Sequence, residues 1–436
     1  MSGITIGIIG VLAGLALIAL RVPIAVALGI VSFLGIIELT NVRAAWGIIT
    51  AVPFNFIGNW SFTAVPMFLL MGYVCTTSGM TTGLFRAMRV CLSRLPGGLA
   101  IASVGACSMF AAASGSSVAT ASAMARIAVP EMLRHKYHSG LSTGVIAASG
   151  TLGSLIPPSI LMVLYGVYAE VSIGKLFMAG FLPGLLSAAL YIAMIISRVK
   201  LNPALAGEVD ESFSAQEKWS AIKEVWALPA LIVFVLGGIF GGFFTPTEAG
   251  AVGAFFATIL AALRRQLTVA NLLEALKATA RGTGSIFIIL IGTIFLTKFL
   301  ALSGLPTWLA EQMLSVSDSV VWIILSVAIL YIVLGMFVDS IGLLLLTLPL
   351  ILPIAVGANM DLIWFGIILI KLLEIGLVSP PVGLNVYVIK GAVGNAVPIQ
   401  TIFQGVAWFI VMDIIALLAI IIFPSLSLYL PSIMKI

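Results

Sequence analysis

Charged residues are scarce in this sequence of 436 residues. Asp, Glu, Lys and Arg make up 8% of the chain, whereas 61% of the residues are hydrophobic and the mean hydropathy is +1.23. Soluble globular domains carry about 25% charged residues, so this composition excludes a water-soluble fold. It predicts an all-α polytopic membrane protein, in which many apolar segments of about 20 residues each cross the bilayer.

Histidine and cysteine are also rare, which limits metal and redox chemistry. The two histidines, His135 and His138, share one polar loop, and the three cysteines, Cys75, Cys91 and Cys107, lack the spacing of metal ligands. A membrane-embedded enzyme needs paired carboxylates or His/Glu metal sites within its apolar segments, and the sequence shows neither. We therefore predict that the protein is not an enzyme.

Two proline pairs stand midway along apolar segments that are long enough to cross a bilayer. The pairs are Pro157-Pro158 and Pro380-Pro381, within the predicted spans 140–168 and 362–388. A proline has no N–H, so the carbonyl four residues earlier loses its helical partner, as at Gly153 and Gly376. In lipid such a carbonyl costs several kcal/mol unless something satisfies it. Broken helices that hold ions are typical of secondary transporters, so we expect two broken Pro-Pro helices rather than simple kinks.

Two other segments, 97–133 and 319–357, each consist of two apolar arms around a short polar tip. The tips contain Ser114-Gly115-Ser116-Ser117 and Val338-Asp339-Ser340. A helical arm of about 17 residues reaches roughly 25 Å, less than the roughly 30 Å of the hydrocarbon core. The arms therefore predict two re-entrant helical hairpins whose tips lie inside the membrane.

The predicted elements occur twice, in the same order. Residues 1–197 and 225–436 each predict five spans and one hairpin, and in both halves the hairpin precedes the broken span; the polar stretch 198–224 is the predicted cytoplasmic linker. A hairpin enters and leaves the membrane on the same side, so only the five spans change the side of the chain. Because five is an odd number, the second half begins on the opposite side of the membrane from the first and has the inverted orientation. Inverted repeats are common in secondary transporters.

The basic residues indicate the orientation of the chain. With the linker in the cytoplasm, 15 of the 21 basic residues fall on the cytoplasmic side and four, Arg43, Lys175, Lys298 and Lys435, on the other. This asymmetry agrees with the positive-inside rule and explains the net charge of +5 without a nucleic-acid partner. Residues 41–58 predict a helix that either lies at the interface or crosses the membrane tilted.

Polar residues at the four broken elements predict ligand sites. Hydroxyl, carboxylate and freed carbonyl oxygens suit Na⁺, and helix N-termini suit a carboxylate. One cation site is expected from Ser114, Ser116, Ser117, Thr151 and the Gly153 carbonyl, and its twin from Asp339, Ser379 and the Gly376 carbonyl. We also assign as candidate substrate contacts Ser116, Thr151, Arg126 and Asn385.

Charged residues inside membrane segments are costly and often functional. Arg126, in a hairpin arm, pairs either with a substrate carboxylate or with Asp339, or else extends to the cytoplasm. Lys371 and Glu374 are three residues apart on one helix, which predicts a structural ion pair. Asp413 is expected to have only a packing role.

Five motifs, taken in order, resemble the large membrane subunit of tripartite ATP-independent periplasmic (TRAP) transporters over essentially the whole chain. They are Phe110-Ala-Ala-Ala-Ser-Gly-Ser-Ser-Val-Ala-Thr120, Ala148-Ser-Gly-Thr-Leu-Gly-Ser-Leu-Ile-Pro-Pro-Ser159, Ser172-Ile-Gly-Lys-Leu-Phe177, Phe244-Thr-Pro-Thr-Glu-Ala249 and Gly335-Met-Phe-Val-Asp339. Arg126 departs from the pattern, because the resemblance leads us to expect a small residue there.

The resemblance implies an elevator-type transporter in the bacterial inner membrane. Residues 97–168 and 319–388 would form its mobile transport domain, and the remainder its scaffold. It also implies Na⁺-coupled import of an organic acid such as a C4-dicarboxylate or sialic acid. A periplasmic substrate-binding protein would deliver the acid, and a small four-helix membrane subunit would be the permanent partner. An alternative is a binding-protein-independent elevator carrier for divalent anions, coupled to Na⁺ or H⁺.

The resemblance further implies two sodium sites. The ligands of the first sodium site would correspond to Ser114, Ser117, Gly153, Ile156 and Pro158 of this sequence. The ligands of the second sodium site would correspond to Gly335, Asp339, Gly376, Ser379 and Val382 of this sequence.

Overall fold

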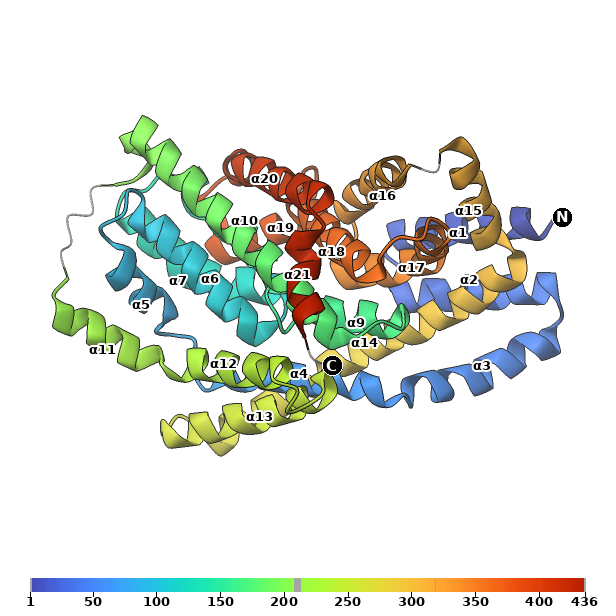
Figure 1. The fold of residues 1–436 in the computed structure, drawn as a ribbon, viewed down its shortest axis with the longest axis horizontal. Helices are drawn as coiled ribbons and strands as arrows, with labels where there is room; N and C mark the ends of the chain where they lie inside the picture. Colours follow the sequence, from blue (N-terminus) through green and yellow to red (C-terminus); the bar gives the residue numbers. More distant parts are fainter. Residues whose placement is uncertain (1, 208–212, 318, 435–436) are drawn as a thin grey trace.

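The computed structural model describes residues 2–207, 213–317 and 319–434, and every regular element in these ranges is a helix (Figure 1). Part of the predicted linker, 208–212, and Lys435 lie outside the described residues.

The described part of the first half, residues 2–207, contains ten α-helices and three short 3₁₀ helices. They are α1 (Gly3–Ala19), α2 (Ile24–Leu39), α3 (Val42–Ile57), η1 (Trp60–Thr63), α4 (Ala64–Thr77), α5 (Leu84–Leu92), α6 (Gly98–Ser114), α7 (Ser117–Arg134), α8 (Ser139–Thr151), η2 (Leu152–Ser154), α9 (Ile160–Tyr168), α10 (Ile173–Leu201) and η3 (Pro203–Leu205).

The second half of the described chain contains eleven α-helices and one 3₁₀ helix. They are α11 (Ala215–Val225), α12 (Ala227–Phe240), α13 (Pro246–Leu263), α14 (Val269–Ser303), α15 (Leu305–Val316), α16 (Val320–Gly335), α17 (Ser340–Gly357), α18 (Leu362–Val378), α19 (Leu384–Val393), η4 (Gly394–Ala396), α20 (Ile399–Ile422) and α21 (Ser425–Ile433).

The helix lengths and compositions are those of a polytopic membrane protein. Six described helical segments are long and apolar enough to cross a bilayer, or seven if α11 and α12, which meet at 55°, form one span. Both predicted broken spans are broken: α8 and α9 flank the first proline pair, and α18 and α19 flank the second. The halves α8, α9 and α19 are each far shorter than the roughly 20 residues that a span needs.

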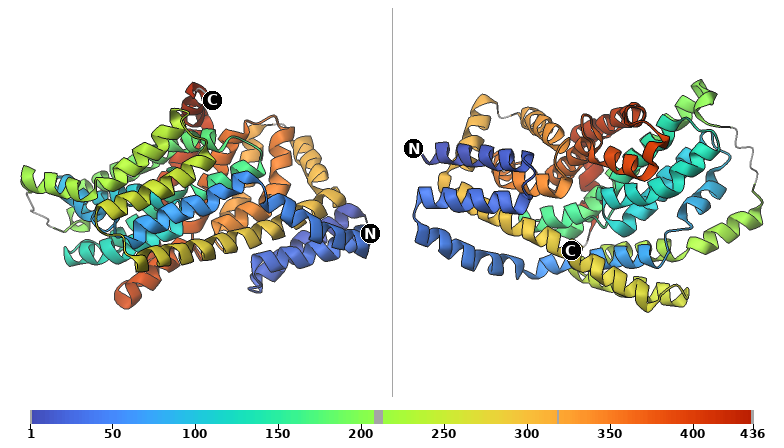
Figure 2. Two further views of the ribbon diagram at one scale, coloured as in Figure 1. Left: turned by 90° about the horizontal axis from the view of Figure 1, so that it is seen from below. Right: turned by 180° about the vertical axis from the view of Figure 1, so that it is seen from behind.

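The helices pack as two groups. The frame group consists of α1–α4 and α12–α14, held together by contacts of α14 with α2 and α4 and of α13 with α4. The hairpin group consists of α6–α10 and α16–α20, in which α20 packs on α8, α19 on α7 and α18 on α16. Figure 2 shows α1–α3, in blue, at one end of the molecule and the teal pair α6–α7 towards the other end, which α11 forms.

Both predicted hairpins are present as pairs of packed helices. In the first, α6 and α7 meet at Gly115, whose φ of 60° is the left-handed conformation that favours glycine. In the second, α16 and α17 are separated by residues 336–339. These boundaries agree with 97–133 and 319–357, and the re-entry of the hairpins into a membrane stays a prediction.

Glycines set the close packing of α8 against α20. A Cβ atom on Gly405 of α20 would lie 1.9 Å from the carbonyl oxygen of Gly140, and one on Gly144 would lie 2.5 Å from the carbonyl carbon of Gly405. Gly140 and Gly144 are four residues apart on one face of α8, which is the small-xxx-small spacing that lets membrane helices approach closely. Helix α20 is therefore part of the hairpin group.

The structure corrects three expectations about element boundaries. The amphipathic pattern of residues 267–281 predicts a helix separate from a span over 283–301. The structure has one helix instead, α14, because glycine inside a helix costs only about 1 kcal/mol and no proline interrupts the segment. The polar stretch 198–224 is not all loop, because α11 begins at a capping box between Ser214 and Glu217. A terminal helix, α21, follows the last predicted span.

Candidate functional site

The tip of the first hairpin lies against the first proline break. A Cβ atom on Gly153 would lie 3.1 Å from the backbone carbonyl of Ser116, and one on Gly115 would lie 2.8 Å from the carbonyl oxygen of Pro158. The N–H of Ile160 donates to the carbonyl of Gly115 at 3.4 Å. These close backbone approaches bring together the residues of the first predicted sodium site.

The second hairpin and the second break repeat this arrangement. A Cβ atom on Gly376 would lie 2.8 Å from the Cα of Gly335, and the N–H of Gly383 donates to the carbonyl of Met336 at 3.2 Å. In both repeats the carbonyl at the end of the incoming hairpin arm thus accepts a hydrogen bond from the start of the half-helix after the break. The two breaks therefore share the same local contact, as the predicted internal repeat would require.

One predicted orphan carbonyl has a partner. The N–H of Ser379 donates to the carbonyl of Gly376 at 3.1 Å, and the Ser379 hydroxyl donates to the carbonyl of Ile375 at 2.7 Å. Because Ser379 leaves the helical conformation, its own N–H turns back and satisfies one lone pair of Gly376. A carbonyl has two lone pairs, so the oxygen retains acceptor capacity for a cation.

Helix ends of both kinds converge between the two breaks. The half-helices α7, α9, α17 and α19 begin there, whereas α6, η2, α16 and α18 end there. Ser116 caps α7, Ser159 caps α9 and Asp339 caps α17 through a bond of 2.9 Å from the Gly342 N–H. N-termini carry partial positive charge and C-termini partial negative charge, so the centre suits a bound anion and bound cations alike.

The remaining predicted ion ligands gather around their own breaks. Ser114 shares a hydrogen bond of 2.9 Å with Thr120, and Ser117 shares one of 2.7 Å with Ser154 beside the first proline pair. Ile156 is buried in the first break, and Val382 is partly buried in the second. The oxygen atoms available as cation ligands belong to hydroxyls, backbone carbonyls and carboxylates, which fit a hard cation such as Na⁺.

A half-open cavity of about 480 Å³ adjoins the first hairpin tip, between the two helix groups. The hairpin group contributes Ser114, Ser116 and Arg126, and the frame group contributes Tyr73 and Thr76, among others. Arg126 is the one charged side chain among the described residues that line this cavity, and its side chain is exposed. The volume is typical of a small-ligand site, and the lining suits an organic anion.

A larger cavity, of about 750 Å³, lies near the end of α9. Its charged lining residue among the described part of the chain is acidic, Glu170, and neither hairpin tip reaches it. An anion would be repelled there, so the smaller cavity is the better candidate for a carboxylate.

The structure does not bring all predicted substrate contacts together. Ser116 and Arg126 line the 480 Å³ cavity, whereas Thr151 and Asn385 do not. Thr151 is 1% exposed and donates to the carbonyl of Ala148, and Asn385 is fully buried and donates to the carbonyl of Ala147. The Asn385 bond ties α19 to α8 inside the hairpin group, whereas the Thr151 bond stays within α8.

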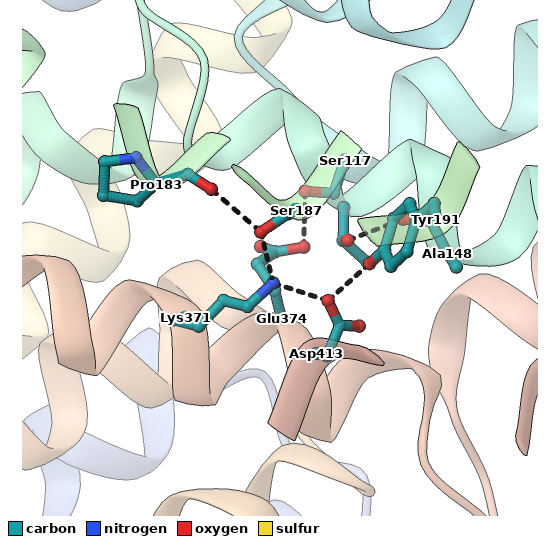
Figure 3. A network of polar contacts seen from close by, with 9 residues as sticks. Ser117, Ala148, Pro183, Ser187, Tyr191, Lys371, Glu374 and Asp413 are labelled. Carbon is teal, nitrogen blue, oxygen red and sulfur yellow. Dashed lines mark hydrogen bonds and ion pairs between the residues drawn. The ribbon is translucent and has the colours of Figure 1, made fainter. Parts of the chain in front are cut away.

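A buried polar network lies behind the hairpin tips (Figure 3). The predicted pair of Lys371 with Glu374 is wrong, because the Lys371 ammonium pairs instead with Asp413 of α20 and donates to Ser187 of α10 at 3.0 Å. Tyr191 of α10 also donates to Asp413. The i,i+3 spacing allowed the first pairing, but neighbouring helices offered Lys371 a carboxylate on the other side.

Sequence analysis therefore missed Asp413 and Tyr191 as members of this network. The available signal was the position of Asp413 within a long apolar segment, where a charge requires a buried partner. All three side chains, Lys371, Asp413 and Tyr191, are at most 1% exposed.

Comparison with known proteins gives a consistent result. Residues 11–426 match the family model described as "Tripartite ATP-independent periplasmic transporter, DctM component". The chain is 36% identical over 377 residues to the C4-dicarboxylate TRAP transporter large permease protein DctM of Pseudomonas aeruginosa, covering 86% of this chain and 87% of that protein. It is 33% identical over 376 residues to the sialic acid TRAP transporter large permease protein SiaM of Vibrio cholerae, with coverages of 86% and 87%.

A solved structure resembles the fold at much lower identity. The YdaH transporter of Alcanivorax borkumensis superposes with a TM-score of 0.62 at 12% sequence identity, covering 89% of this chain and 90% of that one. At this identity the likeness concerns the fold alone.

Proposed function

This chain belongs to the DctM component family of tripartite ATP-independent periplasmic transporters, and we propose that it is the large permease subunit of a sodium-coupled importer of organic acids. Carboxylates such as C4-dicarboxylates or sialic acid are the proposed substrates, since relatives named for both share about a third of the residues. Family membership favours this proposal over a carrier that works without a binding protein.

The observation that carries the proposal is the 480 Å³ cavity with Arg126 on its wall. The guanidinium group presents a fork of donors that matches a carboxylate. Hydroxyls of Ser114, Ser116 and Thr76 line the same cavity and provide neutral partners for further substrate oxygens. An acid that enters between the frame and hairpin groups therefore meets a positive charge next to the first hairpin tip.

The two breaks support sodium coupling. At each break a hairpin tip that carries hydroxyl or carboxylate oxygens packs directly against the segment that holds the proline pair. The predicted sets are Ser114, Ser117, Gly153, Ile156 and Pro158 at the first break, and Gly335, Asp339, Gly376, Ser379 and Val382 at the second. Bound Na⁺ would be cotransported with the acid and would fix the hairpin tips against the breaks.

The packing supports an elevator movement of the hairpin group against the frame group. The predicted transport domain comprised residues 97–168 and 319–388. We extend it to α10 and α20, because Lys371 and Asp413 join α18 to α20, and each also bonds to α10, Lys371 to Ser187 and Asp413 to Tyr191. A mobile unit that left these helices behind would break a buried ion pair.

The description of the family as tripartite supports two partners. We propose a periplasmic substrate-binding protein that delivers the acid and a small four-helix membrane subunit that associates with the frame group. The bacterial inner membrane is the proposed location, because a periplasmic partner and a multi-pass chain meet there.

The proposal is tested by the thermal stability of the purified protein in NaCl, KCl and choline chloride at equal ionic strength. A ligand at 100 times its Kd adds about 2.7 kcal/mol of stability, so we expect a rise of the unfolding temperature that is specific to Na⁺ and is reduced by Asp339→Ala. Reconstituted uptake with the binding protein and small subunit should then require a Na⁺ gradient. Equal unfolding temperatures in all three salts would overturn sodium coupling.

A further inference from the structure

The carboxylate of Glu374 joins the tips of both hairpins. Its Oε2 accepts a hydrogen bond of 2.7 Å from Ser117, which begins α7, and its Oε1 accepts one of 3.5 Å from Ser340, which begins α17. Ser117 in turn shares a hydrogen bond of 2.7 Å with Ser154 at the first break. One side chain of α18 thus contacts the first hairpin, the second hairpin and, through a serine, the first break.

The carboxylate of Glu374 forms no ion pair with any residue that the structure describes. Glu374 is 1% exposed, and no basic side chain of the described residues lies within 4.0 Å of its carboxylate. The basic residue one turn earlier, Lys371, is engaged with Asp413 and Ser187. With both carboxylates ionised, Lys371, Asp413 and Glu374 would together carry a net charge of −1 in a buried region, and an unpaired buried carboxylate is costly unless a cation or metal compensates it.

A small cavity adjoins this carboxylate. It measures about 80 Å³ and its lining includes Ser116, Ser117, Ser154, Asp339, Ser340 and Glu374. Apolar side chains make up the rest of the wall, and among them the two carboxylates and four hydroxyls supply the oxygen ligands that hard cations prefer. A hydroxyl has acceptor lone pairs besides its proton, so Ser117 can face a cation while it still donates to Glu374.

We propose that Glu374 is the charge-balancing ligand of the sodium ion bound at the first hairpin tip, and that through Ser340 it links occupancy of that site to the position of the second hairpin. This inference deepens the proposed sodium coupling and depends on it. None of the ten residues expected as sodium ligands at the two breaks is Glu374. The first of those sets contains no carboxylate, so Glu374 supplies the negative charge that this set lacks.

The test compares Glu374→Gln with Asp413→Asn, an equally buried acidic residue of the same network whose partner is Lys371. The purified full chain is titrated with NaCl against choline chloride at constant ionic strength, and the half-saturating Na⁺ concentration is read from the unfolding temperature. Glutamine keeps the size of the side chain and an oxygen that accepts from Ser117.

For Glu374→Gln we expect the half-saturating Na⁺ concentration to rise by roughly tenfold to a hundredfold, the range for losing a charged partner. In choline chloride alone this variant should be at least as stable as the parent, because an amide is cheaper to bury than a carboxylate. Asp413→Asn should instead lower the unfolding temperature by similar amounts in both salts. Ser340→Ala should raise the half-saturating concentration by a smaller factor, about threefold.

An unchanged half-saturating Na⁺ concentration in Glu374→Gln would overturn the inference, as would equal losses of stability in both salts, which would indicate a purely structural role. If Glu374→Gln does not fold, Ser340→Ala carries the test, and an unchanged half-saturation in that variant overturns the link between hairpins. If the unfolding temperature of the parent protein does not respond to Na⁺, the proposed function itself is overturned. If the parent responds and Glu374→Gln responds with the same half-saturating Na⁺ concentration, only this inference is overturned.

Discussion

Arg126 introduces the only positive charge among the described residues lining the cavity at the first hairpin tip. Replacing Arg126 by Gln removes a charge-assisted hydrogen bond, which is worth about 1.5–3 kcal/mol when the partner is ionised. We expect the KM for an organic acid to rise roughly 10- to 100-fold in reconstituted uptake. Stabilisation by Na⁺ should persist, because Arg126 contributes no ion ligand.

Arg134 provides the matched control for this substitution. It lies on the same helix, α7, but it is 80% exposed, forms only a long contact of 4.0 Å with Glu131 and does not line the cavity. Arg134→Gln should leave the KM unchanged. Equal effects of the two substitutions would argue that Arg126 acts through general surface charge, and not through contact with the substrate.

The buried pair of Lys371 and Asp413 predicts strongly non-additive stability changes. Removing one partner of a buried ion pair leaves an uncompensated charge and costs about 3–5 kcal/mol, whereas neutralising both partners is often nearly neutral. Lys371→Met and Asp413→Asn should each lower the unfolding temperature in detergent, and the double variant should be more stable than either single one. Additive losses in this double-mutant cycle would contradict the assignment of the pair.

At the residue scale, sequence reasoning located the ligand-bearing positions better than their partners. The serines of the first tip and Asp339 follow from polar residues inside apolar runs, which the membrane makes conspicuous. The partner of Lys371 could not be predicted, because Asp413 is 42 residues away and only the packing of α18 on α20 brings them together.

The glycine contact between α16 and α18 controls how closely the second hairpin approaches its break. A Cβ atom on Gly376 would lie 2.8 Å from the Cα of Gly335, and backbone atoms cannot yield as a flexible side chain can. Gly376→Ala should therefore separate the helices, lower stability by about 1–3 kcal/mol, as overpacked cores do, and weaken the Na⁺-dependent part of the stabilisation. Thermal unfolding in NaCl and in choline chloride measures both effects.

Gly391 of α19 offers a control in the same half of the chain. A Cβ atom there meets no heavy atom within 4 Å, so Gly391→Ala adds a better helix former without a clash. This variant should be as stable as the parent or slightly more stable, with an unchanged Na⁺ response. A loss of Na⁺ response in both variants would mean that the effect of Gly376→Ala does not come from the contact with Gly335.

At the element scale, the sequence predicted the breaks and hairpins well and the helix boundaries less well. A proline pair removes two consecutive N–H donors, so the breaks at Pro157-Pro158 and Pro380-Pro381 follow from local chemistry, whereas α10 and α17 run through isolated prolines. The continuity of α14 does not follow from local chemistry, because whether a helix runs through Gly282 and Gly284 depends on its packing along α2 and α4. The membership of α20 in the hairpin group likewise required the contact of Gly405 with α8.

At the scale of the whole molecule, most described helices belong to the frame group or the hairpin group, which touch along an interface, and relative movement of the two groups has a direct test. Tyr168 of α9 and Thr297 of α14 lie on opposite sides of this interface, with their hydroxyls 2.9 Å apart. If the hairpin group travels as a unit, α9 must move past α14 during each transport cycle. A covalent link between these two positions would then hold the groups in the arrangement seen here.

We expect that Tyr168→Cys with Thr297→Cys, joined by a short bifunctional thiol reagent, loses substrate uptake almost completely. The native cysteines Cys75, Cys91 and Cys107 are first replaced by alanine or serine, so that the reagent meets only the introduced thiols. Each single-cysteine variant treated with the same reagent should retain transport. The linked protein should keep its Na⁺-dependent rise in unfolding temperature, because both proposed ion sites lie inside the hairpin group and the link leaves them intact. Uptake that survives complete cross-linking would exclude a sliding movement of α9 along α14 and would favour local opening of the hairpins within an otherwise fixed molecule.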